Sequence, residues 1–507
     1  MPTKRSASPA ASKPTPRKRA RPSSPPADGS SIQDCAGHGE WSDWPAPRSQ
    51  LDEAEDWIRE CVEGKHRVVI CPDKDADGLS SAVVLSIVLR ALSHPPTLVE
   101  IYHLPRALNI HAPAAQSDIL ATFASSGGPT RCIVLDQGSR PGPPLLPLDS
   151  GCETLILDHH LCDVFPEGAQ VLSACHSLPV ATTSLLAYEL AARLVPSLRG
   201  SRPASMAALV GVYGDLGGSK IKFGVESEGP WHASLAPVEK ALTKSALGKA
   251  VALLNAPRRT PQFNVADAYA ALHAAVVGEG NEDVEGQGGL GLKRVLQDDK
   301  LLEAKERTSA ETSRWQGAPP VFSKDGKIAV VTVDSGYQIH PVIATRWCGT
   351  LRKAKTLVCV MCANTGFTPG YVHFSCRAPR RDSSSSSSSS DPVDLIAFLR
   401  SLAPLCDALS PGWSTRVGHD FARGHREATG GIIPRDEYDV LLRVCEVGVK
   451  KEGTASPAKK GGGKGVIDAG MKKGALEGFF KPVAKAGTPS PAKGKAKSEA
   501  AEKKEVK

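Results

Sequence analysis

The chain has 507 residues, a length that accommodates about three domains of ordinary size. It contains no run of about 18 or more apolar residues and no N-terminal signal pattern, so the sequence predicts an intracellular protein that does not span a membrane. The 13 cysteines are scattered and many lie inside apolar runs, which favours reduced, buried thiols over a disulfide framework.

The net charge of +8 is unevenly distributed along the chain. Residues 1–27 carry seven Lys or Arg and no acid, and residues 450–507 carry 15 Lys and six acids, which leaves residues 28–449 with a net charge of −8. The folded part is therefore predicted to be acidic and the two ends basic. Basic ends of this kind favour nonspecific electrostatic binding to nucleic acid. Targeting signals and solvated linkers have the same composition and are the alternatives.

The N-terminal residues 1–47 are rich in Pro, Ser, Ala, Lys and Arg, a composition that predicts a disordered tail. The run PRKRARP at 16–22 is typical of a nuclear localisation signal, so we expect the protein in the nucleus. Residues 51–63 have early acids and apolar side chains at helical spacing, which predicts a helix before the first strand.

The stretch HRVVICPDKDADGLSS at 66–81 predicts a buried strand, a cluster of carboxylates and the start of a helix. Asp73, Asp75 and Asp77 stand at alternate positions, and like charges this close are costly to bury unless a cation lies between them. Their hard oxygen atoms suit Mg²⁺ or Mn²⁺. The alternatives are a surface turn and a Ca²⁺ loop, but an EF-hand would continue with oxygen ligands where this chain has SSAV at 80–83.

Three further apolar runs are each followed by possible metal ligands. RCIVLDQGS at 131–139 contains Asp136, CETLILDHH at 152–160 ends in Asp158, His159 and His160, and LVGVYGDLGG at 209–218 contains Asp215. We expect each run to be a strand, and the carboxyl ends of parallel strands meet at one edge of a sheet, so these side chains should face one crevice. Any one of these acids alone would more often cap a helix, but the whole set is sufficient to hold two metal ions.

In this order, the motifs DKDADG, LDQGS, LDHH and GDLGG resemble the four motifs of the DHH phosphoesterase superfamily. The resemblance spans about residues 65–218 and implies hydrolysis of a phosphoester with two Mn²⁺ or Mg²⁺ ions. It implies that Asp136 bridges the ions, with Asp73 and Asp75 on one side and Asp77, His159 and Asp215 on the other. It also implies that His160 contacts the scissile phosphate and that Asp158 orients its neighbours.

The predicted secondary structure changes after residue 219. Residues 220–320 carry helical signals and predict a helical connector. In residues 321–449, the apolar runs IAVVTVDSG, HPVIATRWCGTL, TLVCVMCA and YVHFSCRA alternate with short helical segments, which predicts a smaller mixed α/β domain. The single CxxC lacks a second pair for a zinc site and is interpreted as part of a strand. The serine tract at 382–391 predicts a disordered loop.

A glycine-rich stretch, GHREATGG at 424–431, combines His, Arg and backbone amides, which are suitable donors for a phosphate. An ordinary glycine loop is the alternative. The stretch resembles the GGHxxAAG signature of the DHHA1 domain through Gly424 and His425, and it departs from the signature at Arg423 and Thr429. The resemblance implies a substrate-binding role for this stretch.

Shorter phrases are similar to the RecJ branch of the superfamily, a single-strand exonuclease that degrades DNA from its 5′ end. They are LLNAPRR, IHPVIATRW and FSCRA, and they imply that His340, Ser375 and Arg377 lie near the substrate. RecJ also carries an OB-fold, which the Lys-rich residues 450–507 cannot form. Strand polarity and the choice between DNA and RNA therefore stay open.

The C-terminal tail is predicted to be disordered and contains one apolar island, KGALEGFFKP at 473–482. Leu476, Phe479 and Phe480 have the spacing of a PCNA-interacting peptide, in which one aliphatic and two aromatic anchors enter a hydrophobic pocket. A chance aromatic pair in a disordered tail is the alternative.

Together these features predict a DHH catalytic domain at 48–219, a connector and a DHHA1 domain. The favoured function is a metal-dependent, RecJ-like exonuclease for single-stranded DNA or RNA in DNA replication or repair. One alternative is a DHH phosphatase or nuclease for small phosphoesters such as short oligonucleotides or nucleoside bisphosphates. The other is a noncatalytic replication scaffold, against which the complete set of Asp and His argues.

Overall fold

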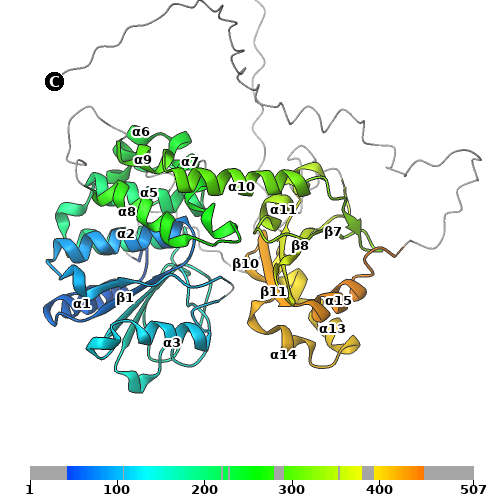
Figure 1. Cartoon of the computed structure of the whole chain (residues 1–507), viewed down its shortest axis with the longest axis horizontal. Coiled ribbons are helices and arrows are strands. Elements are labelled where there is room, and N and C mark those ends of the chain that lie inside the picture. The colour runs from blue at the N-terminus through cyan, green and yellow to red at the C-terminus, as the bar shows by residue number, and fades with distance from the viewer. Residues whose placement is uncertain are drawn as a thin grey trace, which may run out of the picture. The chain divides into compact units, whose positions relative to one another are not determined.

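The structure is a computed structural model, and it describes residues 43–106, 108–218, 221–225, 229–278, 290–351, 354–379 and 393–449 (Figure 1). The predicted C-terminal tail with its apolar island, the serine tract and residues 1–42 of the predicted N-terminal tail lie outside these ranges. Within the ranges, every helix is too short or too polar to cross a bilayer.

The first sheet is entirely parallel and carries the acidic motifs. Its strands lie in the order β2, β1, β3, β4, β5, and each neighbouring pair runs in the same direction. This confirms the predicted α/β domain with a parallel sheet. The strands are β1 (Val68–Pro72), β2 (Val99–Ile101), β3 (Arg131–Leu135), β4 (Glu153–Asp158) and β5 (Gln170–Ser173).

The helices before, between and after these strands cover both faces of the sheet. They are α1 (Arg48–Glu63), α2 (Ala76–Ala91), α3 (Pro113–Ala121), α4 (Thr183–Leu194) and α5 (Arg202–Asp215). Along β1, Val68 and Ile70 pack into the hydrophobic cluster that contains α1, α2, α4 and α5, whereas Val69 and Cys71 pack into a second cluster with α3. Figure 1 shows α2 and α3 on opposite sides of the strands. Burial on both faces explains why the strands are continuous apolar runs.

One predicted strand is wrong. The run that leads to Asp215 is helix α5, and not a strand. Helix α5 is 14 residues long, carries a proline in its first turn and contains three alanines before the apolar run, which are features of a buried helix. Asp215 is therefore the last residue of a helix, whereas Asp136 and Asp158 lie at the ends of strands.

The ordered chain also begins earlier than composition predicts. Trp44 donates its indole N–H to the carbonyl of Pro179 at 2.9 Å, and its ring meets that of Trp231 edge-on at 5.5 Å. Ala46 is fully buried. Residues 43–47, which composition assigns to the disordered tail, are thus packed, because one large aromatic side chain offsets the polar composition around it.

The predicted connector is helical and packs closely on the catalytic domain. Its helices are α6 (Ala236–Leu242), α7 (Lys244–Leu254), α8 (Val265–Val277), α9 (Leu290–Leu296) and α10 (Asp299–Trp315). Buried leucines of α7 and α8, Leu247, Leu254 and Leu272, belong to the same hydrophobic cluster as β1 and α2. These helices therefore complete one face of the catalytic domain as well as linking it to the next sheet.

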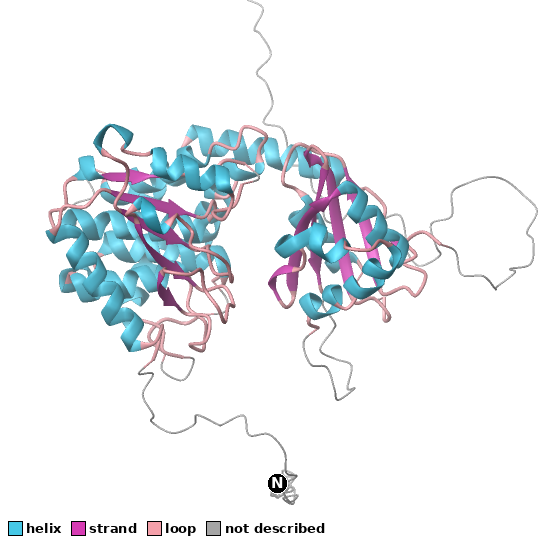
Figure 2. Ribbon diagram, turned by 90° about the horizontal axis from the view of Figure 1, so that it is seen from below, coloured by secondary structure: helices cyan, strands magenta, loops and turns pink. Residues whose placement is uncertain are grey.

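The second sheet is mixed, as predicted, and Figure 2 shows helices beside its strands. Its order is β10, β11, β9, β8, β7, β6, and β7 and β8 are parallel, whereas the other pairs are antiparallel. The CxxC lies in β8, so its interpretation as a strand is confirmed. The strands are β6 (Val321–Phe322), β7 (Ile328–Val333), β8 (Cys359–Thr368), β9 (Tyr371–Arg377), β10 (Arg423–His425) and β11 (Ala428–Pro434).

Helices accompany this sheet as well. They are α11 (His340–Thr350), α12 (Leu395–Arg400), α13 (Ala403–Leu409), α14 (Trp413–Val417) and α15 (Arg435–Val444). The run HPVIATRWCGTL is thus helix α11 and not one of the sheet's strands, and Pro341 lies in its first turn, where a missing N–H is harmless. Trp413 is fully buried in the core of this half and donates its indole N–H to Glu437 O at 2.9 Å.

We predict that Gly211→Ala destabilises the protein by about 1–3 kcal/mol, because a methyl group there overpacks the core. A Cβ at this position of α5 would lie 2.3 Å from the hydroxyl of Ser184 and 2.5 Å from Oδ1 of Asp77. Urea unfolding in EDTA measures the loss. The matched control is Gly248→Ala in α7, where a Cβ meets nothing within 4 Å. This control should be neutral or stabilise the helix by up to about 1 kcal/mol, and equal effects of the two substitutions would contradict the packing argument.

Candidate metal centre

The six predicted metal ligands converge where β1, β3, β4 and α5 end. One trio comprises Asp73, Asp75 and Asp136. A second comprises Asp77, His159 and Asp215. In each trio the candidate ligand atoms lie within 4.8 Å of one another. A third trio of the same size contains Asp136 of the first trio, His159 of the second and His160, so Asp136 connects the two groups through its contact with His159.

Asp77 is fully buried and is held by the N-terminus of α4. Its Oδ2 accepts the backbone N–H of Thr183 at 2.8 Å, and its Oδ1 accepts that of Ser184 at 3.0 Å. The first amides of a helix lack partners within the helix and favour a negative charge. On its other side, α5 passes so closely at Gly211 that only a hydrogen atom fits. Asp77 is therefore clamped between two helices that follow it far along the chain.

Asp136 is also buried, and it leaves β3 with a φ of +61°, a left-handed conformation that Asp adopts more readily than most residues. Its Oδ1 lies 3.3 Å from Nε2 of His159 and accepts the hydroxyl of Thr183 at 3.0 Å. The turn thus directs this carboxylate toward members of both of the first two trios. This is the place that the family resemblance implies for a bridging ligand.

Asp158 organises the histidines that follow it. Its Oδ1 accepts the backbone N–H of His159 at 2.7 Å and lies 2.7 Å from Nδ1 of His160. Its Oδ2 accepts the backbone N–H of Ser139 at 3.2 Å. These partners fix the orientation of the His160 ring, while Nε2 of His159 lies 3.1 Å from Oδ2 of Asp215. Asp158 therefore has the contacts of an orienting residue.

Three residues near the centre were not singled out from the sequence. Arg258 places Nη2 3.5 Å from Oδ2 of Asp75, and Asn255 accepts the backbone N–H of Ala76 through Oδ1 at 3.2 Å. Both residues belong to the segment LLNAPRR, and its similarity to RecJ is the sequence signal that could have identified them. The third is Thr183, described above, which no local pattern distinguishes from an ordinary helix-starting threonine.

The electrostatics of the site are those of buried, crowded carboxylates. Burial, followed by the charge of Asp215, raises the pKa of Asp77 to about 7. Burial and the neighbouring carboxylates also raise the pKa of Asp136 well above its ordinary value. Asp158 is the exception: burial alone would raise its pKa, but His160 and Ser139 lower it to about 2. The hydrogen bond to Asp215 raises the pKa of His159 to about 9 against the effect of burial.

The donor set fits a divalent cation that prefers oxygen ligands. If all five carboxylates ionise, they outnumber the two protonated imidazoles and Arg258 together, and burial makes that excess negative charge costly. Carboxylate oxygens with a minority of imidazole nitrogens suit Mn²⁺ or Mg²⁺ better than a soft, thiol-rich set would. The residues present therefore fit the metal ions that the sequence predicted.

Three of the residues predicted to contact substrate lie together in the second half of the chain. Nη1 of Arg377 donates to the hydroxyl of Ser375 at 2.7 Å, both on β9. His340, at the start of α11, is buried, and its pKa is lowered well below its ordinary value by burial and then by the charges of His373, Arg377 and Arg259. The link to Arg259 shows that the connector reaches this cluster.

The DHHA1-like stretch is a pair of strands and not the loop that was the alternative. Gly424 and His425 lie on β10, which pairs with β11. A Cβ on Gly424 would lie 2.8 Å from Ala428 O, and one on Gly430 would lie 2.4 Å from Phe374 O. These glycines are therefore required for close strand packing. The side chain of His425 and the predicted anchors Leu476, Phe479 and Phe480 lie outside the part of the structure that is described.

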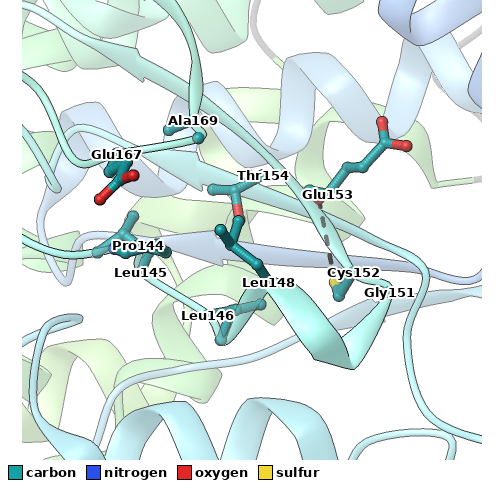
Figure 3. A pocket seen from close by; sticks show the side chains of 11 residues that line it. Pro144, Leu145, Leu146, Leu148, Gly151, Cys152, Glu153, Thr154, Glu167 and Ala169 are labelled. Atoms are coloured by element: carbon teal, nitrogen blue, oxygen red, sulfur yellow. Dashed lines mark hydrogen bonds between the residues drawn. The ribbon is translucent and has the colours of Figure 1, made fainter.

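A separate pocket of about 250 Å³ lies on the same domain (Figure 3). It is lined by Leu146 and Leu148 and by Glu153 and Thr154 at the start of β4. Asp158 ends that strand, and at about 3.3 Å per residue the two ends of β4 are roughly 16 Å apart. The pocket is thus distinct from the candidate metal centre, which none of its lining residues joins.

Comparison with known proteins agrees with this fold. Residues 67–211 match the model of the DHH family, N-terminal domain. RecJ from Thermus thermophilus, solved in complex with Mn²⁺, is similar over 80% of this chain and 55% of its own, with 16% identity and a TM-score of 0.50. This chain therefore spans about half of that RecJ.

A second solved structure is similar over more of its own length. It is the DHH domain of a protein described as a member of a family of ribosomal proteins, and it matches 79% of this chain and 91% of its own, with 12% identity and a TM-score of 0.52. At such identities the likenesses show the fold. Among curated proteins, no sequence matches this chain.

We predict that the metal-free protein loses stability as the pH rises from about 4 to 7. Asp77 has a folded-state pKa of about 7, above the value of about 3.9 of an unfolded Asp, so the folded chain binds the proton more tightly across this range. The loss from Asp77 should be roughly 3 kcal/mol, at about 1.4 kcal/mol for each pKa unit, and the other buried carboxylates with raised pKa act in the same direction. Urea unfolding in EDTA as a function of pH measures it.

Added Mn²⁺ should stabilise the protein more at pH 7.5 than at pH 5, because the cation must displace those protons. Asp77→Asn should flatten the pH dependence in EDTA, since it removes the titrating group. An Mn²⁺ effect of equal size at both pH values would contradict the assignment of this cluster as a metal centre.

Proposed function

We propose that this chain, whose residues 67–211 match the DHH family, N-terminal domain, and whose fold is similar to that of RecJ, is a metal-dependent phosphodiesterase that degrades single-stranded nucleic acid from one end. The observation that carries the proposal is the pair of carboxylate-rich trios connected by Asp136. A mononuclear or structural site has no need for two such groups at one buried point. The set is complete, which favours an enzyme over a noncatalytic scaffold.

Two Mn²⁺ or Mg²⁺ ions would be held by Asp73, Asp75 and Asp136 on one side and by Asp77, Asp136, His159 and Asp215 on the other. When bound, they supply Lewis acidity and lower the pKa of a water that attacks phosphorus. The protein fixes the positions of these ligands through Asp158, Arg258 and the start of α4.

His160 is the proposed contact to the scissile phosphate. Its side chain is about two-fifths exposed, whereas that of Asp158 is 1% exposed, so the ring presents one edge outward while Asp158 holds the other. Asp158 raises the pKa of His160 to about 9 against the effect of burial, which favours a protonated ring near neutral pH. A cationic donor at this place stabilises the charge that develops on the phosphate oxygens.

The second domain is proposed to hold the neighbouring phosphates of the strand. Arg377 carries a guanidinium on β9, next to the hydroxyl of Ser375, and such a pair suits a phosphodiester. His340, Gly424 and His425 are assigned to the same task by their resemblance to RecJ and DHHA1. These residues belong to elements other than those that carry the metal ligands. A substrate that contacts both sets of residues is therefore proposed to be a polymer rather than a mononucleotide.

We predict that the protein degrades a single-stranded oligonucleotide in the presence of Mn²⁺ or Mg²⁺ and not in EDTA. Substrates of DNA and RNA labelled separately at each end report the polarity. Asp136→Asn should lower the rate by more than about 100-fold, because even changes outside the ligand shell cost about 10- to 100-fold. The matched control Asp149→Asn changes an exposed acid between β3 and β4 and should keep wild-type activity.

Two outcomes would redirect the proposal. Hydrolysis of dinucleotides or nucleoside bisphosphates without degradation of long strands would assign the protein to small phosphoesters. Absence of hydrolysis for every substrate and metal ion would leave the noncatalytic scaffold.

The sequence signals outside the described residues extend the proposal to nuclear replication or repair. The basic run at 16–22 supports nuclear localisation, and Leu476, Phe479 and Phe480 support binding to PCNA.

We predict that purified full-length protein binds PCNA, and that replacing Phe479 and Phe480 together by Ala weakens binding at least tenfold, since both aromatic anchors are lost. Calorimetric titration measures this change. Nuclease activity on free oligonucleotides should not change in that variant. An unaltered affinity for PCNA would remove PCNA binding from the proposal.

A further inference from the structure

The start of helix α4 contains two threonines with different tasks. The side chain of Thr182 caps the helix, because its Oγ1 accepts the N–H of Leu185 at 3.4 Å, and it also lies 2.9 Å from the hydroxyl of Ser184. Thr183 follows it and does not cap the helix. Its hydroxyl instead serves a group outside α4.

That group is the carboxylate of Asp136. The hydroxyl of Thr183 donates to Oδ1 of Asp136 at 3.0 Å, and Thr183 itself is fully buried. The backbone N–H of the same residue donates to Oδ2 of Asp77 at 2.8 Å. One residue therefore holds two carboxylates, one through its main chain and the other through its side chain.

The two carboxylates belong to different trios. Asp77 lies with His159 and Asp215, whereas Asp136 lies with Asp73 and Asp75. Their spacing determines how far apart two cations would be held. A donor shared between them keeps that spacing fixed, whereas Asp136 without the hydroxyl of Thr183 could rotate about its own side-chain bonds.

We infer that Thr183 is a positioning residue of the metal centre, which sets the two carboxylate trios relative to each other through one hydrogen bond to each. The inference rests on the proposed function, since it assigns Thr183 to the binding of the same cations. Thr183 makes no contact with the reacting atoms in this assignment and acts through Asp77 and Asp136.

Replacement of Thr183 by Val tests the hydroxyl, because Val keeps the shape and the backbone N–H but cannot donate to Asp136. The affinity of the full-length protein for Mn²⁺, measured by calorimetry and by Mn²⁺ electron paramagnetic resonance, should fall about 10- to 100-fold. Thr183→Ser restores the donor and should bind Mn²⁺ within about threefold of wild type.

The matched control is Thr182→Val, the same substitution one position earlier. The hydroxyl of Thr182 accepts the N–H of Leu185 and lies 2.9 Å from the hydroxyl of Ser184, and in the described contacts it meets no carboxylate of the centre. This variant should lower the unfolding midpoint in EDTA and leave the Mn²⁺ affinity unchanged. Thr183→Val should show the opposite pattern, with a larger change in Mn²⁺ affinity than in metal-free stability.

Wild-type Mn²⁺ affinity in Thr183→Val would overturn the inference while the proposed function stands. An equal loss of Mn²⁺ affinity in Thr182→Val and Thr183→Val would also overturn it, since both would then act only through the packing of α4. Failure of the wild-type protein to bind Mn²⁺ or Mg²⁺ would overturn the proposed function, and the inference with it.

Discussion

The constraint on which the rest of the structure depends is the burial of several carboxylates at one point. Asp77 and Asp136 are almost entirely removed from water, and neighbouring carboxylates raise the cost of ionising each: Asp215 for Asp77, and Asp77 for Asp136. The fold compensates with the amides at the start of α4, the hydroxyl of Thr183 and the guanidinium beside Asp75. These donors are not sufficient to neutralise the cluster, and this remaining charge makes a pair of cations the natural complement of the fold.

The elements near the motifs could be predicted because their signals are local. Val68 to Cys71 is a run of β-branched and apolar residues directly before a carboxylate cluster, and it forms β1 of a parallel sheet. The order of the motifs indicated which acids should meet, because parallel strands bring their carboxyl ends to one edge. The helix before β1 was visible for a similar reason, from its early acids and the helical spacing of its apolar side chains.

What the sequence could not supply were the contacts between distant segments. Asp215 was predicted to end a strand because it follows an apolar run and precedes glycines, whereas that run is part of α5, whose Gly211 and Gly214 let the helix pass close to Asp77 and Ala76. Arg258 reaches Asp75 across more than 180 residues of chain, and Thr183 reaches Asp136 across 47. Only the packing of α2, α4 and α5 against one another determines these neighbours, and no local pattern encodes it.

The short outer strands of both sheets have a consequence for association between molecules. In the first sheet the edges are β2, with three residues, and β5, with four, and in the second they are β10, with three, and β6, with two. An outer strand with free amides and carbonyls is a template on which another chain can add a strand, and its reach grows with its length. Here each template ends after a few residues. The long apolar strands β8 and β9 and the central strands of the first sheet are thereby kept from edge-to-edge pairing, so the same apolar runs that build the core are shielded from aggregation.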